Sequence, residues 1–166
     1  MISIKEAGLK DLSVISDLAH AIWPAAYGEI LSPAQLTYML DKIYALTSLE
    51  NEFLNLQYNF IIAYDKNVPV GFASFSPKEE ESSVFHLHRI YVLPRQQGSG
   101  TGKMLLDNVI NAIKKRGATA LTLNVNRYNK ARYFYEKRGF TIAHEVDIDI
   151  GEGYYMNDYI MELSFQ

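Results

Sequence analysis

The hydrophobic and polar positions of the chain predict an alternation of strands and helices. Short apolar or alternating runs, typical of strands, occur at 2–7, 60–64, 70–75, 82–94, 120–125, 140–148 and 154–165. Helical spacing of apolar residues occurs at 12–22, 33–43 and 104–113, and shorter helices are expected near 46–54 and 128–138. We expect Pro24 to end the first helix, Ser32 to cap the second, and Gly117 to cap the helix that follows the central glycine-rich turn.

The order of these elements predicts the fold class. In the middle of the chain a strand, a turn, a helix and another strand follow one another, which implies a parallel pair, whereas the hairpins imply antiparallel pairs. We therefore expect an α/β (α+β) fold with a mixed central sheet of six to seven strands flanked by about four helices. The length of 166 residues suits a single domain spanning residues 1–166.

Composition and charge exclude several kinds of site. The chain has no cysteine, so disulfides, thiolate zinc sites and cysteine nucleophiles are excluded. The formal net charge of −3 argues against a nucleic-acid partner. The first thirty residues show no secretory signal, and no apolar run approaches the length of a membrane span. We therefore expect a cytoplasmic protein without a membrane partner.

The segment RQQGSGTGK at residues 95–103 precedes the helix at 104–113 and is a candidate anion site, because helix N-termini present unpaired N–H groups. A Walker A loop is excluded, since only three residues separate Gly98 from Gly102 and Met104 follows Lys103. A dinucleotide fingerprint is excluded as well, because Lys103 and Leu105 occupy its glycine positions. A tight turn that binds no ligand is the remaining structural alternative.

Three motifs in order resemble the GNAT superfamily of acetyl-CoA-dependent N-acetyltransferases. The pattern Gln97-x-x-Gly100-x-Gly102 resembles its pyrophosphate loop, IYVLP at 90–94 its fourth strand, and FYEKRGF at 134–140 its terminal helix. The segments 22–40 and 154–163 also resemble bacterial polyamine acetyltransferase-like members. This resemblance implies the GNAT fold, acetyl-CoA as the acyl donor, and contacts to it from Ile90, Tyr91, Val92, Gln97, Gly98, Ser99, Gly100, Thr101, Gly102, Lys103, Asn129 and Tyr135.

The same resemblance implies a role for Tyr135 as the acid that protonates the leaving thiolate; the alternative is a core tyrosine. With neither a cysteine nor an evident serine triad, we expect the amine to attack the thioester directly in a ternary complex. Close approach of the coenzyme is expected at Gly100 and Gly102. Asn129 resembles the asparagine that contacts the pantetheine amide, with Asn126 and Asn124 as alternatives.

His86 and His88 are candidates for the general base. Residues two apart on a strand project from one face, and an unperturbed histidine has a pKa of about 6.5. The pair is similar to that of arylalkylamine acetyltransferases, which relay a proton through it. The alternative is two structural histidines, and two ligands are too few to predict a metal site. Arg89 is expected on the opposite face, with a structural role.

The acceptor side is expected between the first two helices and the final hairpin. There we assign substrate contacts to Trp23, Tyr27, Tyr154, Asn157 and Asp158, because aromatic rings and acids attract a cationic amine. The acidic run at 146–153 contributes to this attraction or is a solvated edge. A small amine or polyamine is the expected acceptor. Alternatives are a protein or peptide N-terminus and a domain that binds acetyl-CoA without catalysis. The aromatic last strand is a candidate to pair across a homodimer.

Overall fold

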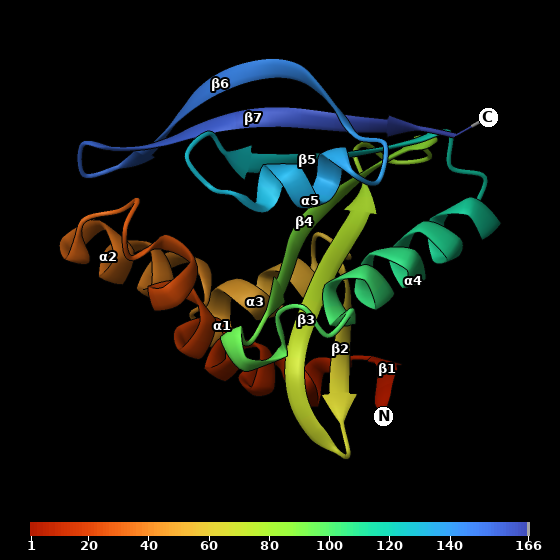
Figure 1. The fold of residues 1–166 in the computed structure, drawn as a ribbon, viewed down its shortest axis with the longest axis horizontal. Coiled ribbons are helices and arrows are strands. Elements are labelled where there is room, and N and C mark those ends of the chain that lie inside the picture. The colour runs from red at the N-terminus through yellow and green to blue at the C-terminus, as the bar shows by residue number, and fades with distance from the viewer. Residues whose placement is uncertain (166) are drawn as a thin grey trace.

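The computed structural model describes residues 1–165, so Gln166 of the predicted domain lies outside it. One mixed sheet contains β1 (Ile2–Glu6), β2 (Asn59–Asp65), β3 (Val68–Pro77), β4 (Val84–Val92), β5 (Ala120–Asn126), β6 (Thr141–Gly151) and β7 (Tyr154–Ser164), in the order β1-β2-β3-β4-β5-β7-β6. The helices are α1 (Leu12–Tyr27), α2 (Pro33–Ile43), α3 (Leu46–Leu54), α4 (Thr101–Lys115) and α5 (Ala131–Glu136). The predicted fold class is confirmed, with five helices instead of about four (Figure 1).

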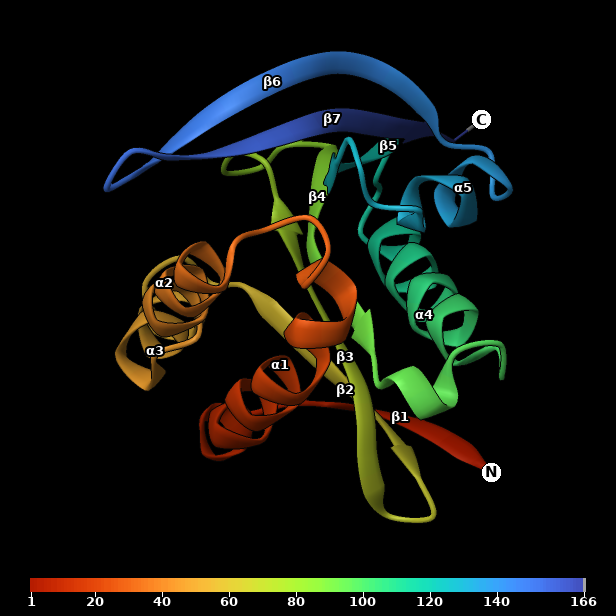
Figure 2. The same cartoon turned by 60° about the vertical axis from the view of Figure 1, so that its left-hand side comes forward.

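The helices cover both faces of the sheet. Helices α1, α2 and α3 lie on one face, and α4 lies on the other (Figure 2). Each face has its own apolar core: Leu105, Leu106 and Val109 of α4 pack on one side, and Ile15, Ile22 and Met39 pack on the other. In the described residues 1–165, no helix has the length and hydropathy to cross a membrane.

The parallel pair of β4 and β5 is short. Its register runs from Val84 opposite Ala120 only as far as Leu87 opposite Leu123. Beyond this point the two strands diverge, and β5, β7 and β6 run in a direction different from that of β2, β3 and β4 (Figure 1). A gap therefore opens in the middle of the sheet.

A β-bulge in β4 lies at the start of this gap. Ser74 of β3 is opposite Arg89 and Phe75 is opposite Leu87, so His88 is the extra residue. The His88 ring is bonded to Ser76 and the Arg89 guanidinium to Ser74, two residues that share a face of β3. Arg89 therefore projects from the same face as His88, and the expectation that it points the other way is wrong.

Arg89 forms an ion pair that joins β4 to α3. Its Nη1 and Nη2 donate to the two carboxylate oxygens of Glu52 at 2.6 and 2.8 Å. The guanidinium also lies 5.0 Å from the Tyr44 ring centroid. Because both charged groups are largely buried, this pair fixes the bulge against the helical layer.

Two local expectations from the sequence are wrong. Helix α1 continues through Pro24 to Tyr27, because Trp23 and Tyr27 on either side of the proline are both buried in the core and offset one missing hydrogen bond. The last strand, β7, was the candidate to pair across a homodimer. It lies between β5 and β6, so its backbone is already paired on both sides and cannot pair with another copy. Among the described residues, the edge strands of the sheet are β1 and β6. By contrast, Ser32 caps α2 by accepting the Gln35 N–H, and Gly117 has the expected positive φ.

The buried ion pair yields the first prediction. Glu52→Gln leaves Arg89 buried without its counter-charge, so we expect the free energy of unfolding to fall by about 3 kcal/mol. The measurement is urea denaturation followed by circular dichroism. Glu50→Gln, at an exposed position of the same helix, is the control and should change stability by less than about 0.5 kcal/mol. Equal effects of the two substitutions would contradict a structural role for the pair.

Candidate functional site

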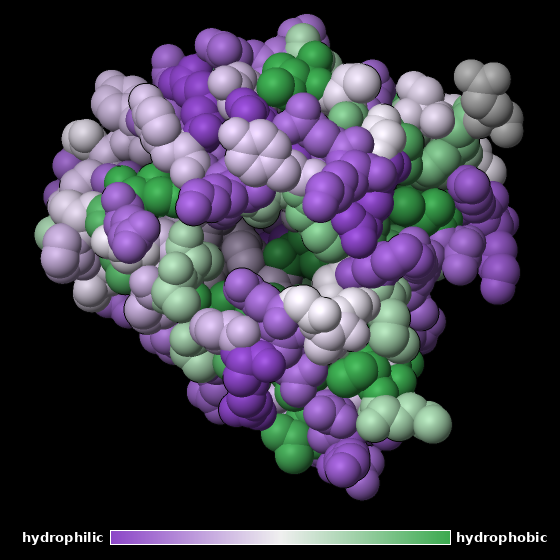
Figure 3. All heavy atoms as spheres, in the orientation of Figure 1, coloured by the Kyte–Doolittle hydropathy of each residue, from purple (hydrophilic) through white to green (hydrophobic). Residues whose placement is uncertain are grey.

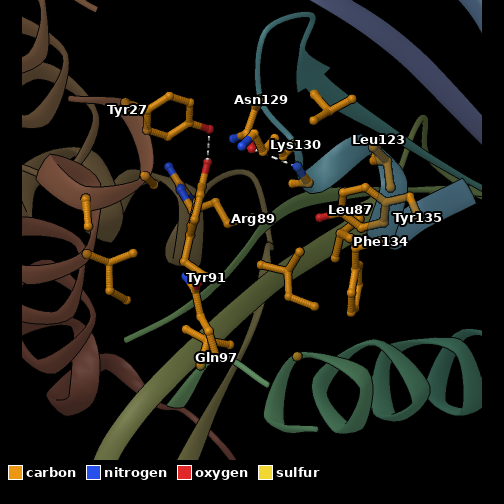
Figure 4. A pocket seen from close by; sticks show the side chains of 18 of the residues that line it. Tyr27, Leu87, Arg89, Tyr91, Gln97, Leu123, Asn129, Lys130, Phe134 and Tyr135 are labelled. Carbon is orange, nitrogen blue, oxygen red and sulfur yellow. Dashed lines mark hydrogen bonds between the residues drawn. The ribbon is translucent and has the colours of Figure 1, made fainter. Parts of the chain in front are cut away.

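A cavity of about 780 Å³ occupies the gap between β4 and β5. Its wall comes from the end of α1, the second half of β4, the loop before α4, the end of β5, and α5. Figure 3 shows the hollow in the middle of one face of the molecule, and Figure 4 shows the side chains around it. Of the residues predicted to contact a coenzyme, all but Ser99 line this cavity. The Ser99 hydroxyl instead lies 2.8 Å from the Thr101 hydroxyl, within the loop.

The glycines of the loop serve different purposes. Gly98 and Gly100 have φ values of +83° and +86°, and a Cβ at either would meet nothing within 4 Å. Both glycines therefore suit the left-handed backbone, and the close approach of the coenzyme expected at Gly100 stays a prediction. Gly102 is helical, and a Cβ there would lie 3.6 Å from the Phe134 ring. Its missing side chain keeps the cavity open beside Phe134.

The loop presents main-chain N–H groups to the cavity. Gly98, Gly100, Thr101, Gly102 and Lys103 donate no backbone hydrogen bond to any acceptor within residues 1–165. The last three belong to the first turn of α4, where the helix dipole adds positive potential. The Lys103 ammonium pairs with Asp107 on the helix surface at 2.9 Å. The backbone is thus the main anion-binding feature of this end of the cavity.

The main chain of β4 supplies a second row of polar groups. Leu93 donates its N–H to the Val70 carbonyl at 2.8 Å. This bond shows which residues at the end of β4 direct their main-chain N–H and C=O groups toward β3. Because these groups alternate in direction along an antiparallel pair, those of Tyr91 face β3 and those of Ile90 and Val92 face β5. Strand β5 has diverged here, so the groups of Ile90 and Val92 face the cavity.

Tyr135 of α5 lies on the opposite wall. Its side chain is only 7% exposed and packs edge-on against Phe134 and Phe140. Its hydroxyl has no hydrogen-bond partner among the described residues and points into the cavity (Figure 4). Burial raises the pKa of this hydroxyl well above its usual range, so it retains its proton at neutral pH. A protonated hydroxyl with no partner is able to donate to a bound molecule.

The two histidines have partners elsewhere. The Nδ1 atom of His86 lies 2.6 Å from the Thr122 hydroxyl. His88 contributes to the cavity wall, but its ring stacks on Tyr58 at 3.8 Å and its Nε2 lies 2.7 Å from the Ser76 hydroxyl. Burial lowers the pKa to about 4 for His86 and about 3 for His88. Bases this weak are poor acceptors of the proton of an ammonium ion at neutral pH. Their contacts with Thr122, Ser76 and Tyr58 agree with the alternative that both histidines are structural.

The three candidate asparagines differ in position. The Oδ1 atom of Asn129 accepts the Ala131 N–H at 2.8 Å, while Asn129 itself lines the cavity. Asn126 is buried, is not part of the cavity wall, and its Oδ1 accepts the Tyr128 N–H. Asn124 lines the cavity, and its Nδ2 donates to Asp158 at 3.3 Å. The structure thus leaves Asn129 and Asn124 as residues able to meet a ligand.

Only one of the five predicted acceptor contacts, Tyr27, lines the cavity. Trp23 is 3% exposed within an aromatic cluster, and Tyr154 packs on Tyr38 at 5.3 Å. Asn157 is not part of the wall, and its carbonyl accepts the Arg127 N–H. Asp158 is buried behind the wall.

The acidic residues of the last hairpin form local ion pairs and a hydrogen bond within the turn. Glu145 and Asp147 form ion pairs with Arg127, and Asp149 accepts the Gly151 N–H. None of these carboxylates belongs to the cavity wall. The expectation that this run attracts an amine into the site is therefore not supported by its placement.

Several wall residues were missed by sequence reasoning. Phe134, Lys130 and Arg138 border the coenzyme-facing side, and Arg138 stacks on Phe134 at 3.8 Å. Glu29 borders the side near α1. The cluster of basic residues at 127–138 was the one sequence feature that could have indicated Lys130 and Arg138. The spacing of apolar residues does not distinguish a side chain that faces a cavity from one that faces solvent.

Comparisons with known proteins agree with this geometry. The Acetyltransferase (GNAT) domain family matches residues 29–153. Spermidine N(1)-acetyltransferase of Thermoplasma acidophilum is 26% identical over 170 residues, covering 99% of this chain and 98% of that protein. The ribosomal protein bS18 alanine N-acetyltransferase of Haemophilus influenzae is 37% identical over 91 residues, covering 55% of this chain and 57% of that protein.

The crystal structure of the PaiA N-acetyltransferase from Thermoplasma acidophilum, in complex with coenzyme A, has a TM-score of 0.83 to this fold at 25% identity, covering 99% of both chains. The family match includes β4, the glycine loop, β5 and α5, which form most of the cavity wall, whereas the part of the wall from α1 precedes the match. This chain therefore belongs to the GNAT family of acetyltransferases.

Proposed function

We propose that this protein transfers the acetyl group of acetyl-CoA to the primary amine of a small molecule, with a polyamine as the leading acceptor class. The main support is the arrangement in the β4–β5 gap, where unpartnered loop amides at one end and the unpartnered Tyr135 hydroxyl on one wall border the same cavity. Amides of this kind suit a diphosphate, and the hydroxyl suits a leaving thiolate.

The residues of the chain fit coenzyme A along the whole gap. The free N–H groups of the loop and of the first turn of α4 would hold the pyrophosphate, and the main chain of Ile90 and Val92 would pair with the pantetheine arm. These N–H groups belong to Gly98, Gly100, Thr101, Gly102 and Lys103. The Asn129 amide is available as a further donor, since only its oxygen is used in the turn. When bound, acetyl-CoA supplies an activated thioester. An N–H of β4 in this row is positioned to stabilise the developing oxyanion.

Tyr135 has the role of general acid in this proposal. Its raised pKa keeps the proton on the hydroxyl at neutral pH, so the hydroxyl can donate a hydrogen bond to the sulfur as the C–S bond breaks. Tyr135 passes this proton to the sulfur as the proton lost by the attacking amine returns to the Tyr135 oxygen, directly or through water, so that the amide and the thiol form with Tyr135 regenerated. Direct attack by the amine accounts for the chemistry without a covalent acyl-enzyme, as expected for a chain that lacks cysteine.

The acceptor side favours a slender molecule over a protein. The Tyr38 hydroxyl and Lys42 ammonium both donate to the Ile150 carbonyl at 3.0 and 2.7 Å, and Gln35 donates to the Tyr155 carbonyl at 3.1 Å. These bonds fasten the tip of the β6–β7 hairpin to α2, and we infer that the fastened hairpin limits access for a large acceptor. The full-length likeness to a spermidine N(1)-acetyltransferase favours the same acceptor class.

A protein N-terminus is the second candidate acceptor. It is favoured by the higher identity to the bS18 alanine N-acetyltransferase, although that likeness covers little more than half of either chain. Thiol release from acetyl-CoA, measured with spermidine, small monoamines and peptides in parallel, distinguishes the two. Release with peptides alone would overturn the small-amine proposal, and coenzyme binding without release on any acceptor would favour a binding domain.

The loop geometry yields a second prediction. Gly100→Ala places a side chain on a left-handed residue beside the proposed pyrophosphate site, so we expect the Kd for coenzyme A to rise at least about tenfold. Gly117→Ala is the control, because Gly117 has a φ of +81° and equally open surroundings at the other end of α4. Its backbone strain should be similar, yet its Kd should stay within about twofold. Isothermal titration calorimetry measures both, and equal Kd values would argue against the loop as the binding site.

The third prediction concerns Tyr135. Tyr135→Phe removes the acid but keeps the ring, so we expect kcat to fall by about 10²-fold while the Kd for coenzyme A changes by less than about threefold. Tyr133→Phe, at a 54% exposed position of the same helix, should leave both quantities unchanged. The rate is measured as free thiol released. Unchanged kcat in Tyr135→Phe would remove this residue from the mechanism.

A further inference from the structure

Asp158 of β7 is a buried carboxylate without a cation. Its side chain is only 3% exposed, and its Oδ1 has no hydrogen-bond partner within residues 1–165. Its Oδ2 accepts one long bond, from the Asn124 amide at 3.3 Å. An unpaired buried charge is unfavourable unless another positive or donating group compensates it. The fold does not supply that group by direct contact.

The surroundings of Asp158 place it directly behind the acceptor side of the cavity. It faces the α1–α3 side of the sheet, because Met156, two residues earlier on the same strand, packs against that core. Burial is the main cause that raises the pKa of the Tyr27 and Tyr91 hydroxyls, and the nearby Asp158 charge raises both further. Arg127 also faces it, but Glu145 and Asp147 already engage that guanidinium.

Asp158 determines which atom Asn124 presents to the cavity. Because the Asn124 Nδ2 donates to the carboxylate, its Oδ1 is left as the atom available to the cavity that Asn124 lines. The Tyr27 and Tyr91 hydroxyls, 2.8 Å apart, add further acceptor oxygens on the same side (Figure 4). The neighbourhood is thus rich in acceptors and backed by a negative charge, which suits an N–H donor with positive charge.

We propose that Asn124, Tyr27 and Tyr91 form a subsite for the primary ammonium group of the acceptor, and that Asp158 is the positioning residue that orients Asn124 and supplies the compensating charge. This inference rests on the proposed function, since it names what the acceptor half of that cavity binds. It also restricts the acceptor to cationic amines. The subsite lies on the side of the sheet opposite α4, away from the proposed coenzyme contacts of the loop.

The test uses Asp158→Asn in the full-length protein, with spermidine as the probe. The substitution is nearly isosteric and removes a buried charge, so the melting temperature should be unchanged or higher and the Kd for coenzyme A unchanged. The KM for spermidine should rise at least about tenfold with kcat altered less than about threefold, because a uniform binding contact is lost. Asp149→Asn, an equal charge change on exposed β6, should leave KM within about twofold.

A double-mutant cycle tests whether Asp158 acts through Asn124. If it does, the double variant Asn124→Ala with Asp158→Asn should raise KM by clearly less than the product of the two single fold-changes, because the loss of Asn124 orientation is counted only once. Additive losses would overturn the positioning role. Two outcomes would overturn the subsite. One is an unchanged KM in Asp158→Asn. The other is a lower melting temperature together with a fall in coenzyme affinity as large as the fall in amine affinity.

Failure of the subsite and failure of the proposed function give different results. If the wild-type protein binds coenzyme A but releases no thiol with any acceptor, the proposed function fails. Calorimetric titration of spermidine into the coenzyme A complex of the wild type and of Asp158→Asn then still tests the subsite. Binding that weakens at least about tenfold in the variant supports it, and equal binding or no binding to the wild type overturns it.

Discussion

The cavity exists because β4 and β5 stop pairing after Leu87 and Leu123. A parallel pair that continued would bond the main chains of Ile90 and Val92 to β5 and fill the gap. The bulge at His88 adds a residue to β4 at this point, which bends the strand and increases its local twist. The ends of β4 and β5 are thereby separated within a continuous sheet, and their polar main-chain groups become available to a ligand.

Two further features keep this opening in place. The Arg89–Glu52 ion pair holds the bulged strand against α3 from one face of the sheet. On the other face, α4 packs its apolar stripe against the sheet, so that its N-terminal amides lie at the mouth of the gap. The proposed coenzyme-binding end is therefore built from backbone groups on rigid elements, whereas the proposed acceptor end is built from side chains of α1, β4 and β5.

Charge is distributed differently between these two ends. Helix-terminal amides and the two basic residues that flank α5, Lys130 and Arg138, border one end, which suits phosphates. Hydroxyl and amide oxygens backed by Asp158 border the other, and most other acidic residues of the hairpin are paired or exposed. Sequence reasoning assigned the attraction of an amine to the visible acidic run. The proposed subsite instead uses Asp158, a buried carboxylate without a cation, because water screens the exposed charges of the run.

The positions of apolar residues, glycines and turns were sufficient to predict the element order, the mixed sheet, the loop before α4 and the register of Tyr135 within FYEKRGF. These features depend on the spacing of apolar residues and on short motifs, both of which can be read within a few residues of the chain. His86 and His88 share a face of β4, as the sequence predicted. The direction of Arg89, the passage of α1 through Pro24, the interior position of β7 and the burial of Asp158 were decided by tertiary structure alone. Side-chain alternation presumes regular strand pairing, and one bulged residue reverses it; burial and partners depend on elements far apart in the sequence that meet only when the sheet is assembled.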